Sequence, residues 1–263
     1  MIKEKEASVI DKRAEIHASA KIAAGVTIGP WSVIGADVEI GEGTVIESHV
    51  VIKGPTTIGK HNHIYQFSSI GEDPQDLKFR GEKSRLEIGD HNLIREFVTL
   101  NRGTEVGGNV TKIGSHNLLM AYVHIAHDCI VGDHIIFANN ASLSGHVIVE
   151  DYVNLGGFSA VHQFCRIGTY AFVARSMVTK DVLPYVKVAG PDSGLYGINR
   201  IGLERHGFDE DSIAAIQKAY KIIFRNKLTV EEALAELKPL AEKYDAVQAL
   251  VDGLNKSTRG ILR

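Results

Sequence analysis

Four histidines and one aspartate in the middle of the chain have the side chains of a general acid–base site. His124, His127 and Asp128 lie close together in the sequence. His146 and His162 follow further along the chain at similar intervals. A neutral imidazole has a pKa of ~6.5 and can accept a proton at neutral pH, while a neighbouring carboxylate can orient it. Whether these groups form one site depends on the fold that positions them.

An aliphatic residue recurs at every sixth position over most of the first two thirds of the chain. Unbroken matches run from Ile10 to Ile70, and the series resumes at Ile88 and again from Ile113 to Val173. This period fits neither an α-helix nor the simple alternation of a long strand. It is typical of a hexapeptide-repeat parallel β-helix, in which each hexad forms one short strand and a corner. The sequence therefore predicts a mainly β protein in which three hexads complete one coil.

Glycine follows the inward aliphatic residue in several hexads, at Gly29, Gly35, Gly41 and Gly59. Glycine adopts positive φ angles without steric cost. We therefore expect these glycines to provide the left-handed backbone conformation of sharp corners.

Residues eighteen positions apart are predicted to lie one above the other on adjacent coils, ~4.8 Å apart. This arithmetic places Asp128 beneath His146 and His127 beneath Gly145, with Ser144 beneath His162 in the coil above. The backbone N–H of Gly145 would then lie close to the imidazole of His127, where it could stabilise an oxyanion. Three converging histidines could instead hold zinc, or the histidines could simply be hydrated at an exposed corner.

Two segments interrupt the repeat, and a different pattern follows it. Residues 71–87 and 101–112 are predicted loop insertions within a β-helical domain that covers residues 1–190. Residues 191–263 are predicted to form a C-terminal helical domain, after a boundary that contains several prolines and glycines. Asp209 can cap a helix whose apolar face contains Ile213, Ile216, Tyr220 and Ile223, and further helices are expected over 229–243 and 245–255.

Composition excludes several classes of protein. The formal net charge of the 263-residue chain is -3, which gives no overall basic field for nucleic acid. The N-terminal residues lack the apolar core of a signal peptide, and no apolar run is long enough to span a bilayer. We therefore expect a soluble cytoplasmic protein. The cysteines Cys129 and Cys165 would lie two coils apart, ~9.6 Å, which is too far for a disulfide.

Several strings resemble the UDP-N-acetylglucosamine acyltransferases, the first enzymes of lipid A synthesis in Gram-negative bacteria. They are IGEDPQDLKFRGE, NLLMAYVHIAHDC, FANNASLSGHV, GGFSAVHQF and the terminal STRGILR. The resemblance covers nearly the whole chain. It implies a left-handed parallel β-helix, a homotrimer with active sites between subunits, and no cofactor or catalytic metal. It also implies that a 3-hydroxyacyl group passes from acyl carrier protein to the 3-position hydroxyl of the sugar in UDP-N-acetylglucosamine.

The same resemblance assigns expected roles to individual residues. His127 matches the family's general base, Asp128 lies beside it, and Gly145 matches the residue whose N–H stabilises the oxyanion. The position that sets acyl-chain length falls on Ala174 or Arg175, because this stretch is one residue shorter than the family pattern. Positions matching those that contact the substrates or the carrier are Asp76, Lys78, His124, His146, His162, Gln163, Asn199 and Arg205.

The chain departs from the family pattern at several positions. Asn101 stands where some members have histidine, and an acidic residue of the tail is replaced by Arg200 or Ile201. Some members acylate an amine at the 3-position, and a general base suits either nucleophile. A zinc-dependent hydrolyase similar to the γ-class carbonic anhydrases and a noncatalytic nucleotide-sugar-binding scaffold remain alternative functions.

Overall fold

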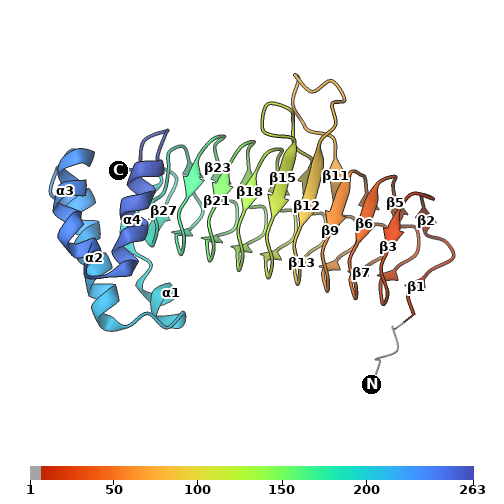
Figure 1. Cartoon of the computed structure of the whole chain (residues 1–263), viewed down its shortest axis with the longest axis horizontal. Helices are drawn as coiled ribbons and strands as arrows, with labels where there is room; N and C mark the ends of the chain where they lie inside the picture. The colour runs from red at the N-terminus through yellow and green to blue at the C-terminus, as the bar shows by residue number, and fades with distance from the viewer. Residues whose placement is uncertain (1–6) are drawn as a thin grey trace.

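The computed structural model describes residues 7–263, which form a long three-sided prism with helices at one end (Figure 1). Short strands alternate with corners, and each strand up to β23 pairs in parallel with the strand three places later. Three parallel sheets result, one on each side of the prism. The parallel β-helix predicted from the six-residue period is confirmed.

The strands are distributed over the three sheets in regular rotation. The first sheet contains β1 (Val9–Ile10), β4 (Thr27–Ile28), β7 (Val45–Ile46), β10 (His63–Ile64), β13 (Leu93–Ile94), β16 (Leu118–Leu119), β19 (Ile136–Phe137), β22 (Asn154–Leu155), β25 (Phe172–Val173), β27 (Val186–Ala189) and β28 (Gly194–Ile198). The second contains β2 (Glu15–Ile16), β5 (Val33–Ile34), β8 (Val51–Ile52), β11 (Ser69–Glu72), β14 (Thr99–Asn101), β17 (His124–Ile125), β20 (Ser142–Leu143), β23 (Ala160–Val161) and β26 (Met177–Val178). The third contains β3 (Lys21–Ile22), β6 (Val38–Ile40), β9 (Thr56–Ile58), β12 (Arg85–Ile88), β15 (Val110–Ile113), β18 (Ile130–Val131), β21 (Ile148–Val149) and β24 (Arg166–Ile167).

The repeated aliphatic residues fill the interior of the prism. In the first sheet Ile46 pairs with Ile64 and Ile64 with Ile94, and all three are fully buried. Each inward residue therefore packs on its equivalent one coil away, which removes apolar surface from water along the whole prism. Phe137 is the largest fully buried side chain of this core.

The expectation for the glycines after the inward residues is wrong. Positive φ occurs two residues after the position that these glycines occupy in the hexad, at non-glycine residues such as Trp31, His49 and Asp128. Gly29 and Gly41 are required for a different reason: a Cβ on Gly41 would lie 2.5 Å from the carbonyl of Gly59 on the next coil. These glycines permit close contact between coils and do not supply a left-handed conformation.

Two loops leave the prism between strands of neighbouring coils and lie side by side (Figure 1). They span residues 73–84 and 102–109. Both loops are shorter than the predicted insertions, 71–87 and 101–112, because β12 and β15 begin inside those segments. Asn101 at the base of the second loop donates its side-chain N–H to the carbonyl of Asp73 in the first, at 2.7 Å. The guanidinium of Arg102 forms an ion pair with the carboxylate of Asp73 as well.

The C-terminal end adds a hairpin and four helices. Strand β28 pairs antiparallel with β27, so the first sheet continues past residue 190. The helices are α1 (Arg200–Arg205), α2 (Glu210–Arg225), α3 (Val230–Ala241) and α4 (Asp245–Lys256). Asp209 caps α2 as predicted and the predicted apolar face is buried, whereas the hairpin and α1 were not predicted. Within residues 7–263, no helix has the length and apolar character needed to cross a membrane.

Candidate active site

The predicted catalytic residues lie at the corner between β17 and β18. Ile125 points into the core, so the preceding His124 points outward, and the chain then turns through Asp128, whose φ is 62°. Strand β17 pairs with β20 so that His124 is opposite Ser142 and Ile125 is opposite Leu143. The eighteen-residue register is therefore confirmed, and the N–H of His146 donates to the carbonyl of His127 at 3.0 Å.

His127 and Asp128 form a hydrogen-bonded pair. The Nδ1 atom of His127 lies 2.7 Å from Oδ2 of Asp128, and the side chains are 12% and 1% exposed. Asp128 also accepts hydrogen bonds from the backbone N–H of Thr104 at 2.7 Å and from its hydroxyl at 2.6 Å. Because the backbone N–H can only donate, the carboxylate functions as an acceptor.

The ionised form of Asp128 is favoured in spite of its burial. Burial alone would raise the pKa of this carboxyl group, but hydrogen bonds from His127 and Thr104 outweigh it and lower the pKa below its usual value. An ionised Asp128 requires that Nδ1 of His127 carries the proton. In the neutral form of the ring the other nitrogen, Nε2, is then unprotonated and can accept a proton from a substrate.

Gly145 lies directly against the imidazole of His127. A Cβ added at Gly145 would lie 2.6 Å from Cε1 and 2.8 Å from Nε2 of His127, so only glycine fits there without moving the ring. Within residues 7–263 the N–H of Gly145 donates no hydrogen bond, whereas at another corner the N–H of Ser115 donates to the carboxylate of Asp133 at 2.6 Å. This N–H is therefore available to a ligand near Nε2.

His146 and His124 border the pair on two sides. His146 Nε2 lies 3.5 Å from Oδ2 of Asp128, and its ring stacks on Phe164 with centroids 4.5 Å apart. Nδ1 of His124 forms a 2.7 Å hydrogen bond with the hydroxyl of Thr99. Burial lowers the pKa of both histidines, and for His146 it outweighs the opposing attraction of the Asp128 carboxylate. Both rings are thus held neutral to lower pH than a free histidine.

The first loop and the next coil bring further predicted residues to this corner. Asp76 is close enough to His146 to favour its charged form, and its side chain accepts the backbone N–H of Lys78 at 2.9 Å. The side chain of Lys78 is exposed. One coil above, His162 is half-buried with Nδ1 3.1 Å from the carbonyl of Gln163, whose side chain is exposed.

Asn199 and Arg205 lie elsewhere on the same chain. They line a cavity of about 580 Å³ between α1 and the outer face of the first sheet, whereas His127 lies between the second and third sheets. Asn199 caps α1 and its amide donates to the carbonyl of Tyr170 at 3.0 Å. Within one chain, the structure does not bring these two residues to the His127–Asp128 pair.

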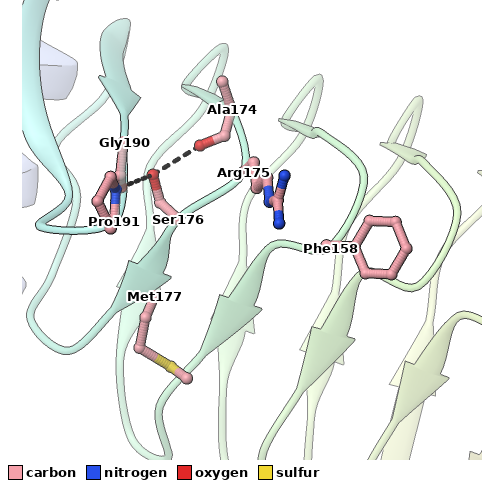
Figure 2. A pocket seen from close by; sticks show the side chains of 7 residues that line it. All are labelled: Phe158, Ala174, Arg175, Ser176, Met177, Gly190 and Pro191. Carbon is pink, nitrogen blue, oxygen red and sulfur yellow. Dashed lines mark hydrogen bonds between the residues drawn. The ribbon is translucent and has the colours of Figure 1, made fainter.

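Ala174 and Arg175 line a third region, between the first and second sheets. This cavity of about 570 Å³ is largely apolar and also contains Phe158, Met177 and Pro191 (Figure 2). The guanidinium carbon of Arg175 lies 5.9 Å from the centre of the Phe158 ring. The two residues therefore sit beside an apolar cavity, as an acyl-chain site would need.

One group of side chains could ligate a metal ion. The ligand atoms of His127, Asp128 and His146 all lie within 4.8 Å of one another. This set combines two histidines with one carboxylate. It therefore differs from the site of three histidines that the spacing in the sequence suggested for zinc. Both Asp128 oxygens already accept hydrogen bonds from Thr104, so a metal would have to compete with them.

Thr104 is the residue of this site that the sequence did not indicate. It lies in the second loop, outside the six-residue repeat, and contacts Asp128 across 24 residues of sequence. The spacing G-T-x-x-G-G over residues 103–108 is a turn signal that could have drawn attention to it.

Two protein-family models match parts of this chain, and known proteins match nearly all of it. Residues 110–145 match the bacterial transferase hexapeptide family, which makes the chain a hexapeptide-repeat transferase. Residues 181–262 match the family described as Udp N-acetylglucosamine O-acyltransferase, Domain 2. The acyl-[acyl-carrier-protein]--UDP-N-acetylglucosamine O-acyltransferase of Pseudomonas entomophila is 52% identical and aligns over 97% of this chain and 100% of its own.

Solved structures agree with this assignment. The UDP-N-acetylglucosamine O-acyltransferase of Moraxella catarrhalis is 48% identical with a TM-score of 0.95, covering 97% of this chain and 99% of that one. The Arabidopsis UDP-N-acetylglucosamine acyltransferase is 36% identical with a TM-score of 0.83, covering 98% and 99%. The chain belongs to the UDP-N-acetylglucosamine O-acyltransferase family.

Replacing Gly145 by alanine tests the contact between this residue and His127. The added methyl would meet the imidazole ring and displace it, and a displacement of ~1 Å at a reacting group costs about 100-fold in turnover. Acyl transfer by Gly145→Ala should therefore fall by about that factor, with little change in Tm. Gly157→Ala is the matched control, because its Cβ would approach only the carbonyl of Asn139, at 3.4 Å. Equal turnover in the two variants would contradict the assigned contact.

Proposed function

We propose that this protein transfers a 3-hydroxyacyl group from acyl carrier protein to the 3-position hydroxyl of UDP-N-acetylglucosamine, the first step of lipid A biosynthesis. Family membership supports the reaction, since the relatives carry the names of the acyl donor and the nucleotide sugar. The single observation that carries the mechanism is the buried His127–Asp128 pair, whose free Nε2 faces Gly145. His127 is the proposed general base.

The proposed reaction is a direct acyl transfer. Nε2 of His127 removes the proton of the sugar hydroxyl while the hydroxyl oxygen attacks the thioester carbonyl carbon. The carbonyl oxygen gains negative charge, which the N–H of Gly145 stabilises. When the tetrahedral intermediate collapses, the carbon–sulfur bond breaks and the proton on His127 passes to the departing thiolate. Asp128 stabilises the imidazolium between these two proton transfers.

The neighbouring polar residues are proposed to hold the two substrates around this pair. His124, His146 and Asp76 border the pair and are proposed to contact the sugar. His162, Gln163 and the exposed Lys78 are proposed to contact the acyl group or the carrier's phosphopantetheine arm. No cofactor is required by this scheme, because the substrate hydroxyl attacks an already activated thioester.

A homotrimer is proposed to complete the active site. Asn199 and Arg205 line the cavity between α1 and the outer face of the first sheet, on a different side of the prism from His127. A row of exposed stacked aromatic rings, which includes Trp31, Phe67 and Tyr122, follows the edge between the first and second sheets. Such an exposed apolar row is typical of a surface that another subunit covers. In a trimer the cavity lined by Asn199 and Arg205 of one subunit is proposed to face the His127 corner of the next and to hold the nucleotide, with both substrates drawn from the cytoplasm.

The activity test uses purified protein, a panel of 3-hydroxyacyl carriers, UDP-N-acetylglucosamine and its 3-amino analogue. The wild-type protein is expected to acylate the hydroxyl acceptor, and His127→Ala to lose about 100-fold or more in turnover with its fold retained. His17→Ala, which alters an exposed histidine near the other end of the prism, serves as the control. Near-normal turnover in His127→Ala would refute its role as the base, and exclusive use of the amine would change the acceptor.

Arg175 is proposed to limit the length of the acyl chain. Its large side chain lies beside the apolar cavity with Phe158, so it would block the far end of a long chain (Figure 2). Arg175→Gly should shift the preferred donor toward longer acyl chains, measured as kcat/KM over carriers of graded length. Arg175→Lys keeps a long side chain and should keep the wild-type preference. An unchanged preference in the glycine variant would refute this role.

A further inference from the structure

The second loop folds tightly over the catalytic carboxylate. Thr104 is 3% exposed, and its carbonyl accepts hydrogen bonds from the N–H groups of Gly107 at 3.1 Å and Asn109 at 2.8 Å. These bonds close a turn whose tip, Val106, is 86% exposed. A Cβ on Gly107 would lie 1.9 Å from Cγ of Asp128. There is therefore no room for a side chain at Gly107, and the backbone of the turn packs directly against the carboxylate.

The hydrogen bonds around Asp128 have a fixed direction. The N–H of Gly107 points at the hydroxyl oxygen of Thr104, 3.3 Å away, and this oxygen lies 2.6 Å from Oδ2 of Asp128. A threonine hydroxyl has one proton, and a backbone N–H can only donate. Within residues 7–263 the hydroxyl of Thr104 donates to Oδ2 of Asp128, whose Oδ1 accepts the N–H of Thr104 itself. Both bonds are stronger when Asp128 is ionised, because a charged acceptor strengthens a hydrogen bond.

We propose that Thr104 is a positioning residue, which acts through Asp128 to hold the proton of His127 on Nδ1 and keep Nε2 free as the base. The two bonds that Thr104 donates favour the ionised form of Asp128, and an ionised carboxylate can accept its third bond only from Nδ1–H of His127. Without the hydroxyl of Thr104, Oδ2 loses a donor and the carboxylate can rotate or take up a proton. This inference rests on the proposed function of His127.

The alternative is that Thr104 only stabilises the fold, and Thr44 provides the matched control. Thr44 is also fully buried; its hydroxyl donates to the carbonyl of Gly59 at 3.0 Å and accepts the N–H of Asn62 at 3.2 Å. It lies on the edge between the third and first sheets, away from the catalytic corner. Thr44→Val thus removes a comparable buried hydroxyl without touching Asp128.

The experiment compares Thr104→Val, Thr104→Ser and Thr44→Val for kcat, KM for UDP-N-acetylglucosamine, and Tm. A hydrogen bond to a charged group contributes enough to predict a loss of about ten-fold or more in kcat for Thr104→Val, with little change in KM. Thr104→Ser retains the hydroxyl and should recover most of the activity. Thr44→Val should lose stability but keep its kcat.

The pH profile gives a second readout. The hydrogen bonds that lower the pKa of Asp128 include those from Thr104, so removing the hydroxyl raises this pKa. Activity that depends on ionised Asp128 is lost as pH falls, and in Thr104→Val this loss should begin at higher pH than in wild type. The titratable groups facing Asp128 are His127 and His146, and both are unchanged in the variant.

Two outcomes would contradict the inference. Wild-type kcat in Thr104→Val, or a kcat loss in Thr44→Val as large as that in Thr104→Val, would overturn it. If Thr104→Val does not fold, Thr104→Ala removes the same hydroxyl with a smaller side chain and is judged by the same criteria. Absence of acyl transfer in the wild-type protein would instead refute the proposed function, so the two failures can be distinguished.

Discussion

The structure depends on the pairing of each short strand with its equivalent one coil away. A two-residue strand has too few hydrogen bonds and too little buried surface to be stable alone, so it persists only because the equivalent strands of the neighbouring coils pair with it. The inward isoleucines set the register, since a slip of one residue would turn them outward. The same register fixes which residues from separate coils meet at the corners, including His127 and Gly145.

The corner that contains His127 and Asp128 depends on this rigidity to hold a buried charge. An ionised carboxylate that is 1% exposed is unfavourable unless hydrogen bonds replace the lost water. Thr104 and His127 provide three such bonds to Asp128, and the turn closed by Gly107 keeps water away from it. In the proposed mechanism this sets the tautomer of His127 before any substrate arrives, with Nε2 next to the unused backbone N–H of Gly145. Such preorganisation is the usual source of catalytic electrostatic stabilisation.

The sequence predicted those parts of the molecule that follow a period. The six-residue spacing predicted the β-helix, and its multiple of eighteen predicted that His127 lies against Gly145 and Asp128 beneath His146. It did not predict Thr104, because the second loop has no period and its contact with Asp128 depends on how the loop folds back. The glycine expectation failed for Gly41 because sequence spacing cannot distinguish a positive φ from close contact between backbones. Helix α1 and the β27–β28 hairpin were missed because each is too short for a helical or strand pattern to emerge.

The tautomer of His127 is the property on which the mechanism rests. It can be measured by nitrogen NMR of protein labelled at its histidine side chains, with a His127→Gln variant to assign the signals, at a pH where the ring is neutral. A protonated Nδ1 and an unprotonated Nε2 for His127 would agree with the hydrogen bond to ionised Asp128. A neutral His127 with its proton on Nε2 would leave no base at the position facing Gly145 and would contradict the account.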